Sequence, residues 1–146
     1  MKVRDCYQRV TPEVDLVRTD TSIEDVIEII AKNPASRSVY VLDENEELVG
    51  TISVREVLNI LGAKYLKKRS IAVLHEILAQ TASDIMKDAE SVSLDDDLED
   101  ALKVAVVHGL EDLPVLEGGK VVGNLDCFEL IKGIKESHAA ERDKKQ

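Results

Sequence analysis

The sequence predicts a mixed α/β fold made of two β-α-β-β-α repeats related by a pseudo-twofold axis. The main observation is that four blocks occur twice in the same order, at offsets drifting from 79 residues (Asp5 to Asp84) to 73 (Gly50 to Gly123). Each copy also carries apolar residues at helical spacing and β-branched runs flanking polar turns. Two copies are too few for a solenoid, which needs about three to bury its faces. The matched blocks are Asp5 with Asp84, 21–26 with 96–101, 39–43 with 113–117, and 48–52 with 121–125.

The first copy begins with a short strand at 15–18. Thr21 and Glu24 have the capping-box spacing, and the apolar residues that follow them predict a helix with one buried face, ended by Asn33-Pro34. Two strands are then expected at 38–42 and 48–52, around the polar turn 43–47. Ser53 and Glu56 repeat the capping-box spacing and predict a helix through about Leu61.

The second copy follows the same plan. A short strand is expected at 91–93, and then a helix capped near Asp96 that ends at His108-Gly109. A hairpin of 113–116 and 121–125 turns at Gly118-Gly119. Asp126 and Glu129 again have capping spacing and predict a helix through about Gly133 or beyond.

These elements divide the chain into repeat 1 (1–61), a connecting helical segment (62–80), repeat 2 (81–136) and a tail (137–146). In the connecting segment we expect a helix from about Ala63 to Gln80, with an interruption at Arg69-Ser70. This helix could cap the core or make a dimer contact. The mixed-charge residues from Lys135 onwards have few large apolar side chains, and we expect them to fray.

Composition excludes several classes of function. The net charge of −10 argues against nucleic-acid binding, which depends on neutralising phosphates. No run of about 18 apolar residues is present, so no membrane span is expected, and no signal peptide is visible. Cys6 and Cys127 do not match in the repeat and predict reduced thiols in a cytoplasmic protein. The three scattered histidines indicate no metal site.

The ordered motifs resemble a tandem pair of cystathionine-β-synthase (CBS) domains, also called a Bateman module. Ser83-Asp84-Ile85-Met86 is similar to the family's opening motif, and Leu113-Pro114-Val115 followed by Gly123 is similar to its centre. The first copy matches with 4–6, 39–41 and 50–56, so the resemblance covers about residues 2–135. It implies homodimers in flat, disc-like assemblies, and AMP, ADP, ATP or S-adenosylmethionine bound in clefts between repeats. It implies no catalysis and no required cofactor.

The family's adenosine signature is a glycine, then a Ser or Thr, then an Asp that holds the ribose hydroxyls. The first copy keeps Gly50 and Ser53 but has Glu56 at the acid position. The second has Asp126 at the hydroxyl position and Glu129 at the acid position, so a phosphate would meet a negative charge there. The site containing Ser53 and Glu56 is therefore the better candidate, although both pairs are also complete helix caps that need no ligand.

A phosphate also requires cations. Arg37, just before a strand, and Arg55, in the first turn after Ser53, are the best placed basic residues in the sequence, although such a residue is more often a solvated surface charge. The 95–97 aspartate run is interpreted as a helix N-terminal charge cluster, favoured by the helix dipole.

Two functions fit the sequence, and a third does not. The first is a regulatory sensor that binds an adenosine-containing ligand, signals through dimer geometry, and is read by an unknown protein partner. The alternative is a ligand-free dimerising scaffold with degenerate nucleotide sites. An enzyme is not expected, because the sequence contains no Ser-His-Asp set, no phosphate-cradling GxxxxGK[ST] loop and no metal cluster.

Overall fold

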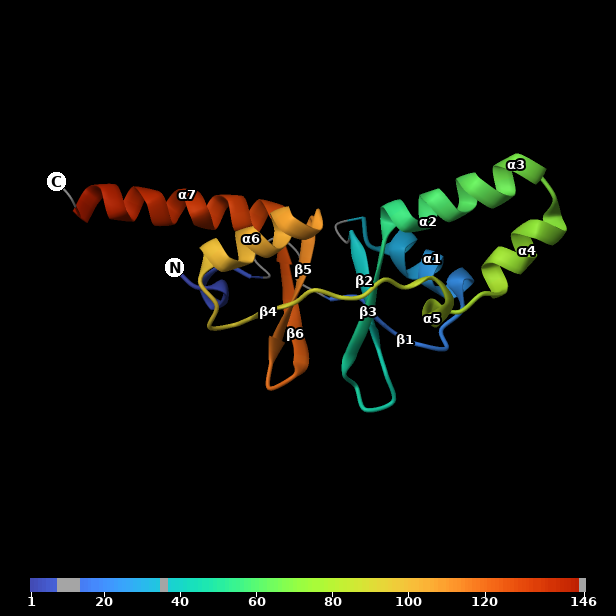
Figure 1. The fold of residues 1–146 in the computed structure, drawn as a ribbon, viewed down its shortest axis with the longest axis horizontal. Coiled ribbons are helices and arrows are strands. Elements are labelled where there is room, and N and C mark those ends of the chain that lie inside the picture. The colour runs from blue at the N-terminus through green and yellow to red at the C-terminus, as the bar shows by residue number, and fades with distance from the viewer. Residues whose placement is uncertain (8–13, 35–36, 145–146) are drawn as a thin grey trace. The chain divides into compact units, whose positions relative to one another are not determined.

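The chain forms two compact units, each built around a three-stranded sheet (Figure 1). The structure is a computed structural model that describes residues 1–7, 14–34 and 37–144. Unit 1 consists of Met1–Val14 together with Glu90–Gln146, and unit 2 is Asp15–Ala89. The mixed α/β class and the two repeats are confirmed. The units, however, do not follow the repeat boundaries, because the opening of the chain belongs to the unit that holds the second sheet.

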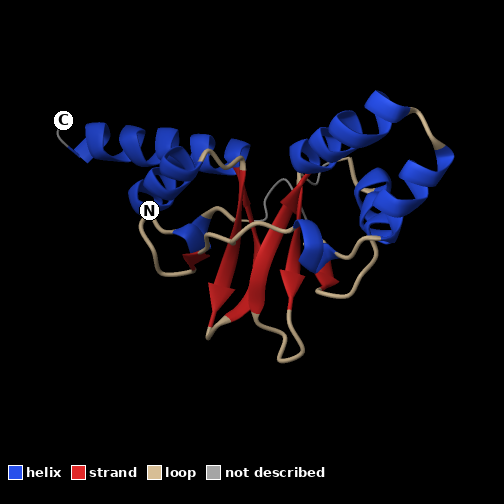
Figure 2. Ribbon diagram, turned by 45° about the vertical axis from the view of Figure 1, so that its right-hand side comes forward, coloured by secondary structure: helices blue, strands red, loops and turns tan. Residues whose placement is uncertain are grey.

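The sheet of unit 2 has the order β1-β2-β3, formed by Leu16–Arg18, Ser38–Leu42 and Leu48–Ser53. β1 and β2 are parallel, so helix α1 (Ile23–Lys32) makes the crossover between them, while β2 and β3 form an antiparallel hairpin. The helices lie to one side of this sheet (Figure 2). The core between sheet and helices contains Val17, Ile23, Val26, Val39, Val41, Ile52, Val57 and Ala82.

The connecting segment is helical in two parts. Helix α2 (Val54–Ile60) continues without a break through the π-helical turn η2 (Leu61–Tyr65) into α3 (Leu66–Lys68). The predicted end of one helix at Leu61 and start of another at Ala63 was therefore wrong, because no Pro or capping residue stops the run there. The predicted interruption is confirmed: Arg69 has a φ of 45° and Ser70 caps α4 (Ile71–Ala79). The short helix α5 (Ala82–Ile85) follows.

Unit 1 repeats the same sheet, with the order β4-β5-β6 formed by Val92–Ser93, Asp112–Glu117 and Lys120–Asp126. Helix α6 (Leu98–His108) ends at Gly109, and the hairpin turns at Gly118 and Gly119, all three with positive φ, as the sequence predicted. Helix α7 (Cys127–Lys144) continues through residues 137–144 of the tail, where the sequence predicts fraying, and residues 145–146 lie outside the described part of the chain. Its last turns contain Ala, Glu, Arg and Lys, which are strong helix formers and extend a helix already packed on the core.

The opening segment of each repeat packs on the sheet of the other repeat. The 3-10 turn η1 (Val3–Asp5) lies in unit 1, and α5 of the second repeat lies in unit 2. The two segments use the same backbone hydrogen bonds. Val3 N–H donates to the Asp96 carbonyl at 2.9 Å, and Ala82 N–H donates to the Thr21 carbonyl at 2.8 Å. Both side chains are fully buried, so each opening completes the core of its unit.

This exchange explains why Asp5 matches Asp84 in the sequence. Each carboxylate accepts the N–H of the residue three positions earlier, Lys2 or Thr81, at 2.8 Å. Both aspartates therefore close a capping box on the turn that enters the core. The duplicated aspartate is a structural residue of each opening segment.

Two predicted caps were placed one residue too early. Thr21 Oγ1 accepts from Arg18 N–H, and Asp96 Oδ2 accepts from Ser93 N–H, so both brace the turn before a helix. The N-cap residues are Ser22 for α1 and Asp97 for α6. A side chain that hydrogen-bonds within a turn and one that caps a helix can have the same three-residue spacing, so the sequence pattern does not distinguish the two roles.

Candidate functional site

The turn from Ser53 to Glu56, called the Ser53 turn below, joins β3 to α2 and holds three of the predicted site residues, Ser53, Arg55 and Glu56. Ser53 Oγ accepts the Glu56 N–H at 3.2 Å, and Glu56 Oε2 accepts the Ser53 N–H at 2.8 Å. The capping box is thus complete, and it fixes the Glu56 carboxyl group at the start of the helix. The Glu56 side chain is 15% exposed.

Arg37 lies beside this turn. Its backbone carbonyl accepts the Val54 N–H at 3.0 Å, and the neighbouring Ser38 pairs with Ser53 across the β2–β3 ladder. Arg55 is exposed in the first turn of α2. The backbone of unit 2 therefore brings Ser53, Glu56, Arg37 and Arg55 to one end of the β2–β3 hairpin.

Glu56 also lines a pocket that lies wholly within unit 2 and has a volume of about 350 Å³. This volume is in the usual range for small-molecule sites. The lining combines carboxylates, ammonium groups, amides and two isoleucines, an arrangement able to hold a ligand with both polar and apolar parts. The lining residues are Glu56, Asn59, Ile60, Lys64, Gln80, Asp84, Ile85 and Lys87.

Charges in the pocket are partly neutralised by protein groups. Lys87 Nζ lies 3.6 Å from Glu56 Oε1, and the Lys87 side chain is 71% exposed. Such an exposed ion pair contributes about 0–1 kcal/mol, so a ligand can replace it at little cost. Asp84 accepts hydrogen bonds from the backbone N–H and the hydroxyl of Thr81, which lower the pKa of its carboxyl group and keep it ionised.

The corresponding turn of the second copy is strongly acidic. Asp126 Oδ1 accepts the Phe128 N–H at 2.8 Å, and Glu129 Oε1 accepts the Asp126 N–H at 2.8 Å. Both side chains are buried. Glu111, whose carbonyl accepts the Cys127 N–H, occupies the place that Arg37 has in the first copy. A phosphate here would meet carboxylates where the first copy offers a guanidinium, so this turn is less suited to an anion.

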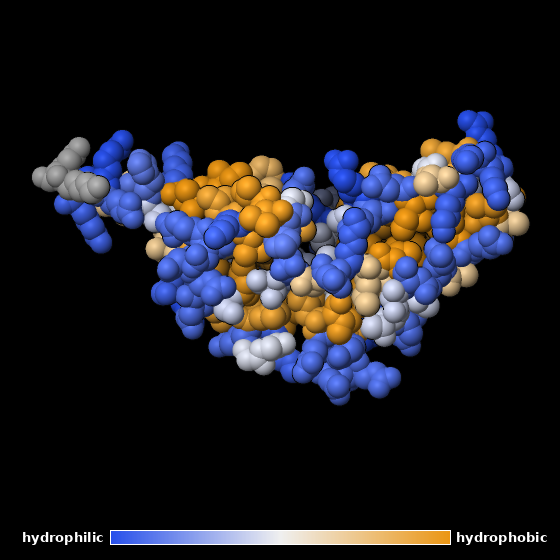
Figure 3. Space-filling view, viewed as in Figure 1, coloured by the Kyte–Doolittle hydropathy of each residue, from blue (hydrophilic) through white to orange (hydrophobic). Residues whose placement is uncertain are grey.

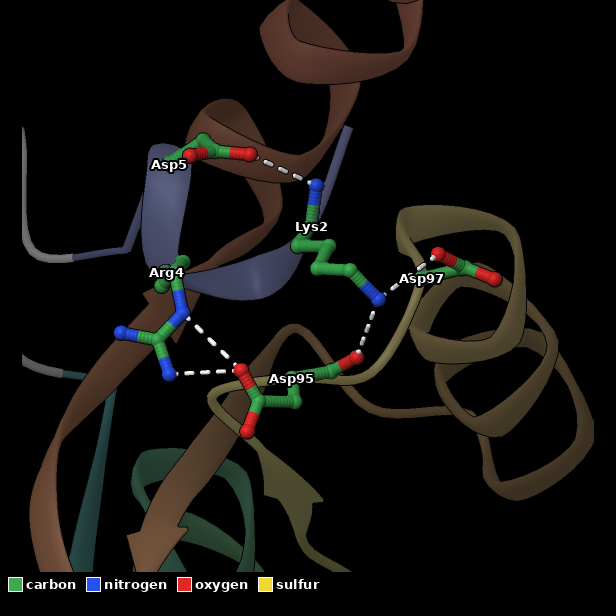
Figure 4. Close-up of polar contacts among 5 residues, drawn as sticks. All are labelled: Lys2, Arg4, Asp5, Asp95 and Asp97. Carbon is green, nitrogen blue, oxygen red and sulfur yellow. Dashed lines mark hydrogen bonds and ion pairs between the residues drawn. The ribbon is translucent and has the colours of Figure 1, made fainter.

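The 95–97 aspartates anchor the N-terminal segment within unit 1 (Figure 4). Arg4 Nη2 lies 2.6 Å from Asp95 Oδ1, and Lys2 Nζ lies 3.5 Å from Asp97 Oδ1. Its hydrogen bond with Asp95 raises the pKa of the Arg4 guanidinium. The aspartate run therefore has a second role besides its interaction with the dipole of α6, because Asp95 and Asp97 form ion pairs with Arg4 and Lys2 at the start of the chain.

Sequence reasoning did not place the pocket residues beside Glu56, although two of them, Asp84 and Ile85, belong to the opening motif of the second repeat. Lys87 lies close to Glu56 because its backbone pairs with that of Thr51. The Thr51 N–H donates to the Lys87 carbonyl at 2.9 Å, and the Lys87 N–H donates to the Thr51 carbonyl at 3.0 Å. Gln80 and Lys64 come from the connecting segment, for which the sequence predicts only a cap on the core or a dimer contact. No motif in the sequence marks Lys64, Gln80 or Lys87. Among the described residues, no group of three or more histidine, cysteine or acidic side chains could hold a metal ion.

Two repeats with exchanged openings, each with a hydroxyl or acid at a strand-to-helix turn, define a tandem α/β module. Comparison with known protein families identifies the family of this module. The CBS domain family matches residues 3–63 and again 82–136, so the chain belongs to the CBS-domain family as a tandem pair. None of the curated proteins compared with the chain matches it.

Solved structures agree with this assignment. A CBS domain-containing protein from Thermotoga maritima has a TM-score of 0.78 and 30% identity, over 93% of this chain and 95% of that chain. The protein CBSX2, solved in complex with AMP, has a TM-score of 0.71 and 22% identity, over 94% of this chain and 98% of that chain. A CBS-domain protein from Agrobacterium tumefaciens has a TM-score of 0.71 and 18% identity, over 90% and 91%. The last two likenesses, under 25% identity, show the fold alone.

Proposed function

We propose that this chain is a regulatory sensor that binds an adenosine-containing ligand such as AMP, ADP, ATP or S-adenosylmethionine at the Ser53 turn of unit 2. The observation that carries the proposal is that Glu56, at the family's acid position, lines a pocket of about 350 Å³. A carboxylate accepts two hydrogen bonds at once and so matches the vicinal hydroxyls of a ribose. The AMP bound to CBSX2 supports the choice of ligand class.

Arg37 and Arg55 are the proposed phosphate-binding residues, and Ser53 is the proposed hydroxyl contact. The cationic side of the turn favours an anionic ligand at this end of the hairpin. We propose no ligand at Asp126 and Glu129, because their turn carries negative charge where the first copy has Arg37. A regulatory response requires that the ligand bind one conformation of the protein more tightly than another.

The proposal is tested by calorimetric titration of the whole chain with AMP, ADP, ATP and S-adenosylmethionine. The informative variant is Glu56→Gln, because glutamine still accepts the Ser53 N–H and keeps the capping box, but loses the charge that strengthens the ribose contacts. We expect about tenfold weaker binding with an unchanged melting temperature. Glu129→Gln, at the equivalent position, is expected to leave the affinity unchanged. Absence of heat and of any melting shift at millimolar ligand would contradict the proposal.

A ligand-free dimerising scaffold is the second candidate function, and two observations favour it. Both oxygens of Glu56 already have protein partners, Ser53 and Lys87. In addition, apolar side chains gather on the surface over α6 and the start of α7 (Figure 3). They include the exposed residues Leu102, Val106, Phe128 and Ile131. We propose that a second copy of the chain covers this surface. A dimer in sedimentation that Ile131→Glu dissociates, together with no nucleotide binding, would favour the scaffold.

No helix of the described residues is both long enough and apolar enough to cross a membrane. The partner that would read the ligand state, and a cytoplasmic location, remain predictions from the sequence.

A further inference from the structure

One buried oxygen of a residue that lines the unit 2 pocket accepts no hydrogen bond from the described residues. Gln80 Oε1 is buried, and no group of residues 1–7, 14–34 or 37–144 donates a hydrogen bond to it. Buried polar atoms are nearly always hydrogen-bonded in folded proteins, so an orphaned one calls for an explanation. Gln80 lines the same pocket as Glu56.

The backbone of Gln80 is held firmly in place. Its N–H donates to the Ile77 carbonyl at 3.2 Å at the end of α4, and its carbonyl accepts the Ile23 N–H at 2.7 Å at the start of α1. The terminal torsion of a glutamine side chain is soft. Oε1 is shielded in the free protein, so a ligand reaches this oxygen only after the amide turns toward the pocket, and this turn breaks no hydrogen bond between Oε1 and a described residue.

The other side chains near Gln80 suit a flat ring. Ile60 and Ile85 are half-buried and supply the apolar part of the lining, while the neighbouring Asn59 is exposed. A primary amide presents an acceptor and a donor side by side, and glutamine pairs in this way with the amino group and adjacent ring nitrogen of adenine. With the ribose at Glu56, the base would enter the part of the pocket that Gln80 borders.

We propose that Gln80 is the residue that recognises the amino-bearing edge of the base, and so selects a 6-aminopurine. This inference rests on the proposed function and adds to it the source of base specificity. In the free protein none of the described residues donates to the amide oxygen, and the 6-amino group of the bound base supplies a donor. The family's signature residues hold the ribose and phosphate, whereas Gln80 comes from the connecting segment.

The test combines a change in the ligand with a change in the protein. AMP and purine riboside 5′-monophosphate, which lacks the 6-amino group, are titrated into the wild-type chain and into Gln80→Met. We expect the wild type to bind AMP about fivefold to tenfold more tightly, the factor expected from one neutral hydrogen bond, and the variant to bind both ligands equally. Lys64→Met is the matched control in the same pocket. It changes both affinities by the same factor and leaves their ratio unchanged.

Three outcomes separate the inference from the proposed function. If AMP binds and the ratio of affinities persists in Gln80→Met, the inference is overturned and the proposed function stands. If the wild type binds the two ligands equally, the inference is also overturned and the proposed function stands. A water molecule would then be the hydrogen-bond partner of Gln80. If the wild type binds neither ligand, the inference is overturned, and the proposed function fails with it if ADP, ATP and S-adenosylmethionine also give no heat. Because the substitution removes an unpaired buried oxygen, Gln80→Met is expected to melt no lower than the wild type. Gln80→Leu serves if the methionine variant does not fold.

Discussion

The exchange of opening segments predicts that the first residues of the chain stabilise unit 1 as strongly as core residues do. Val3 is fully buried and packs in a cluster with Leu98, Leu113 and Leu125, which all come from the second half of the chain. Val3→Ala removes two methyl groups. At about 0.8 kcal/mol for each, plus the cavity left behind, we expect a loss of about 2–3 kcal/mol in the free energy of unfolding.

The assay is urea unfolding followed by circular dichroism, with comparison of midpoints at unchanged slope. The matched control is Val122→Ala in β6 of the same unit, where the side chain is 38% exposed and the expected change is within about 0.5 kcal/mol. A second readout is labelling of the Cys6 thiol, which is 1% exposed and should react faster in Val3→Ala. If Val3→Ala and Val122→Ala unfold at the same midpoint, the opening segment does not belong to the core of unit 1 and the reasoning is refuted.

Three further predictions concern unit 2. Ser53→Ala removes the oxygen that caps α2 and should cost about 0.5–2 kcal/mol in urea unfolding, whereas Ser53→Thr keeps the cap; equal losses would exclude a capping role. The hydrogen bonds to Asp84 lower its pKa below the ordinary value of 3.8, so its carboxylate stabilises the fold above that pH and loses this effect as the pH falls through the lowered value. The stability difference between wild type and Asp84→Asn should therefore shrink in acid, and a difference independent of pH would contradict the mechanism. A Cβ on Gly50 would lie 2.5 Å from Sδ and 2.9 Å from Cβ of Met86. Gly50→Ala should thus cost about 1–3 kcal/mol, and a double-mutant cycle with Met86→Ala should show less than additive loss, while full additivity would rule out the contact.

The duplication and the type of each element could be predicted from the sequence, because they depend on local patterns. Strands, helices and the hairpin at Gly118-Gly119 are encoded by apolar spacing and by residues that accept positive φ. The capping box of Ser53 and Glu56 is likewise a contact over three residues, and its geometry agrees with the predicted spacing. The predicted helix start was wrong at Thr21, because the same residue spacing occurs in a turn and in a helix cap. The predicted helix end was wrong in α7, because the helix continues past its last large apolar residues.

What the sequence determined by itself is the family and the identity of the turn that carries Ser53 and Glu56. Only the tertiary structure decided which segment completes which core, because repeat 1 could equally close on its own opening turn or on that of repeat 2. The same long-range packing brings Gln80 and Lys87 to the pocket of Glu56, 24 and 31 residues along the chain from it (80 − 56 and 87 − 56). Contacts between such distant residues follow from the burial of apolar helix and sheet faces against one another and not from a local pattern. A local motif therefore does not predict them.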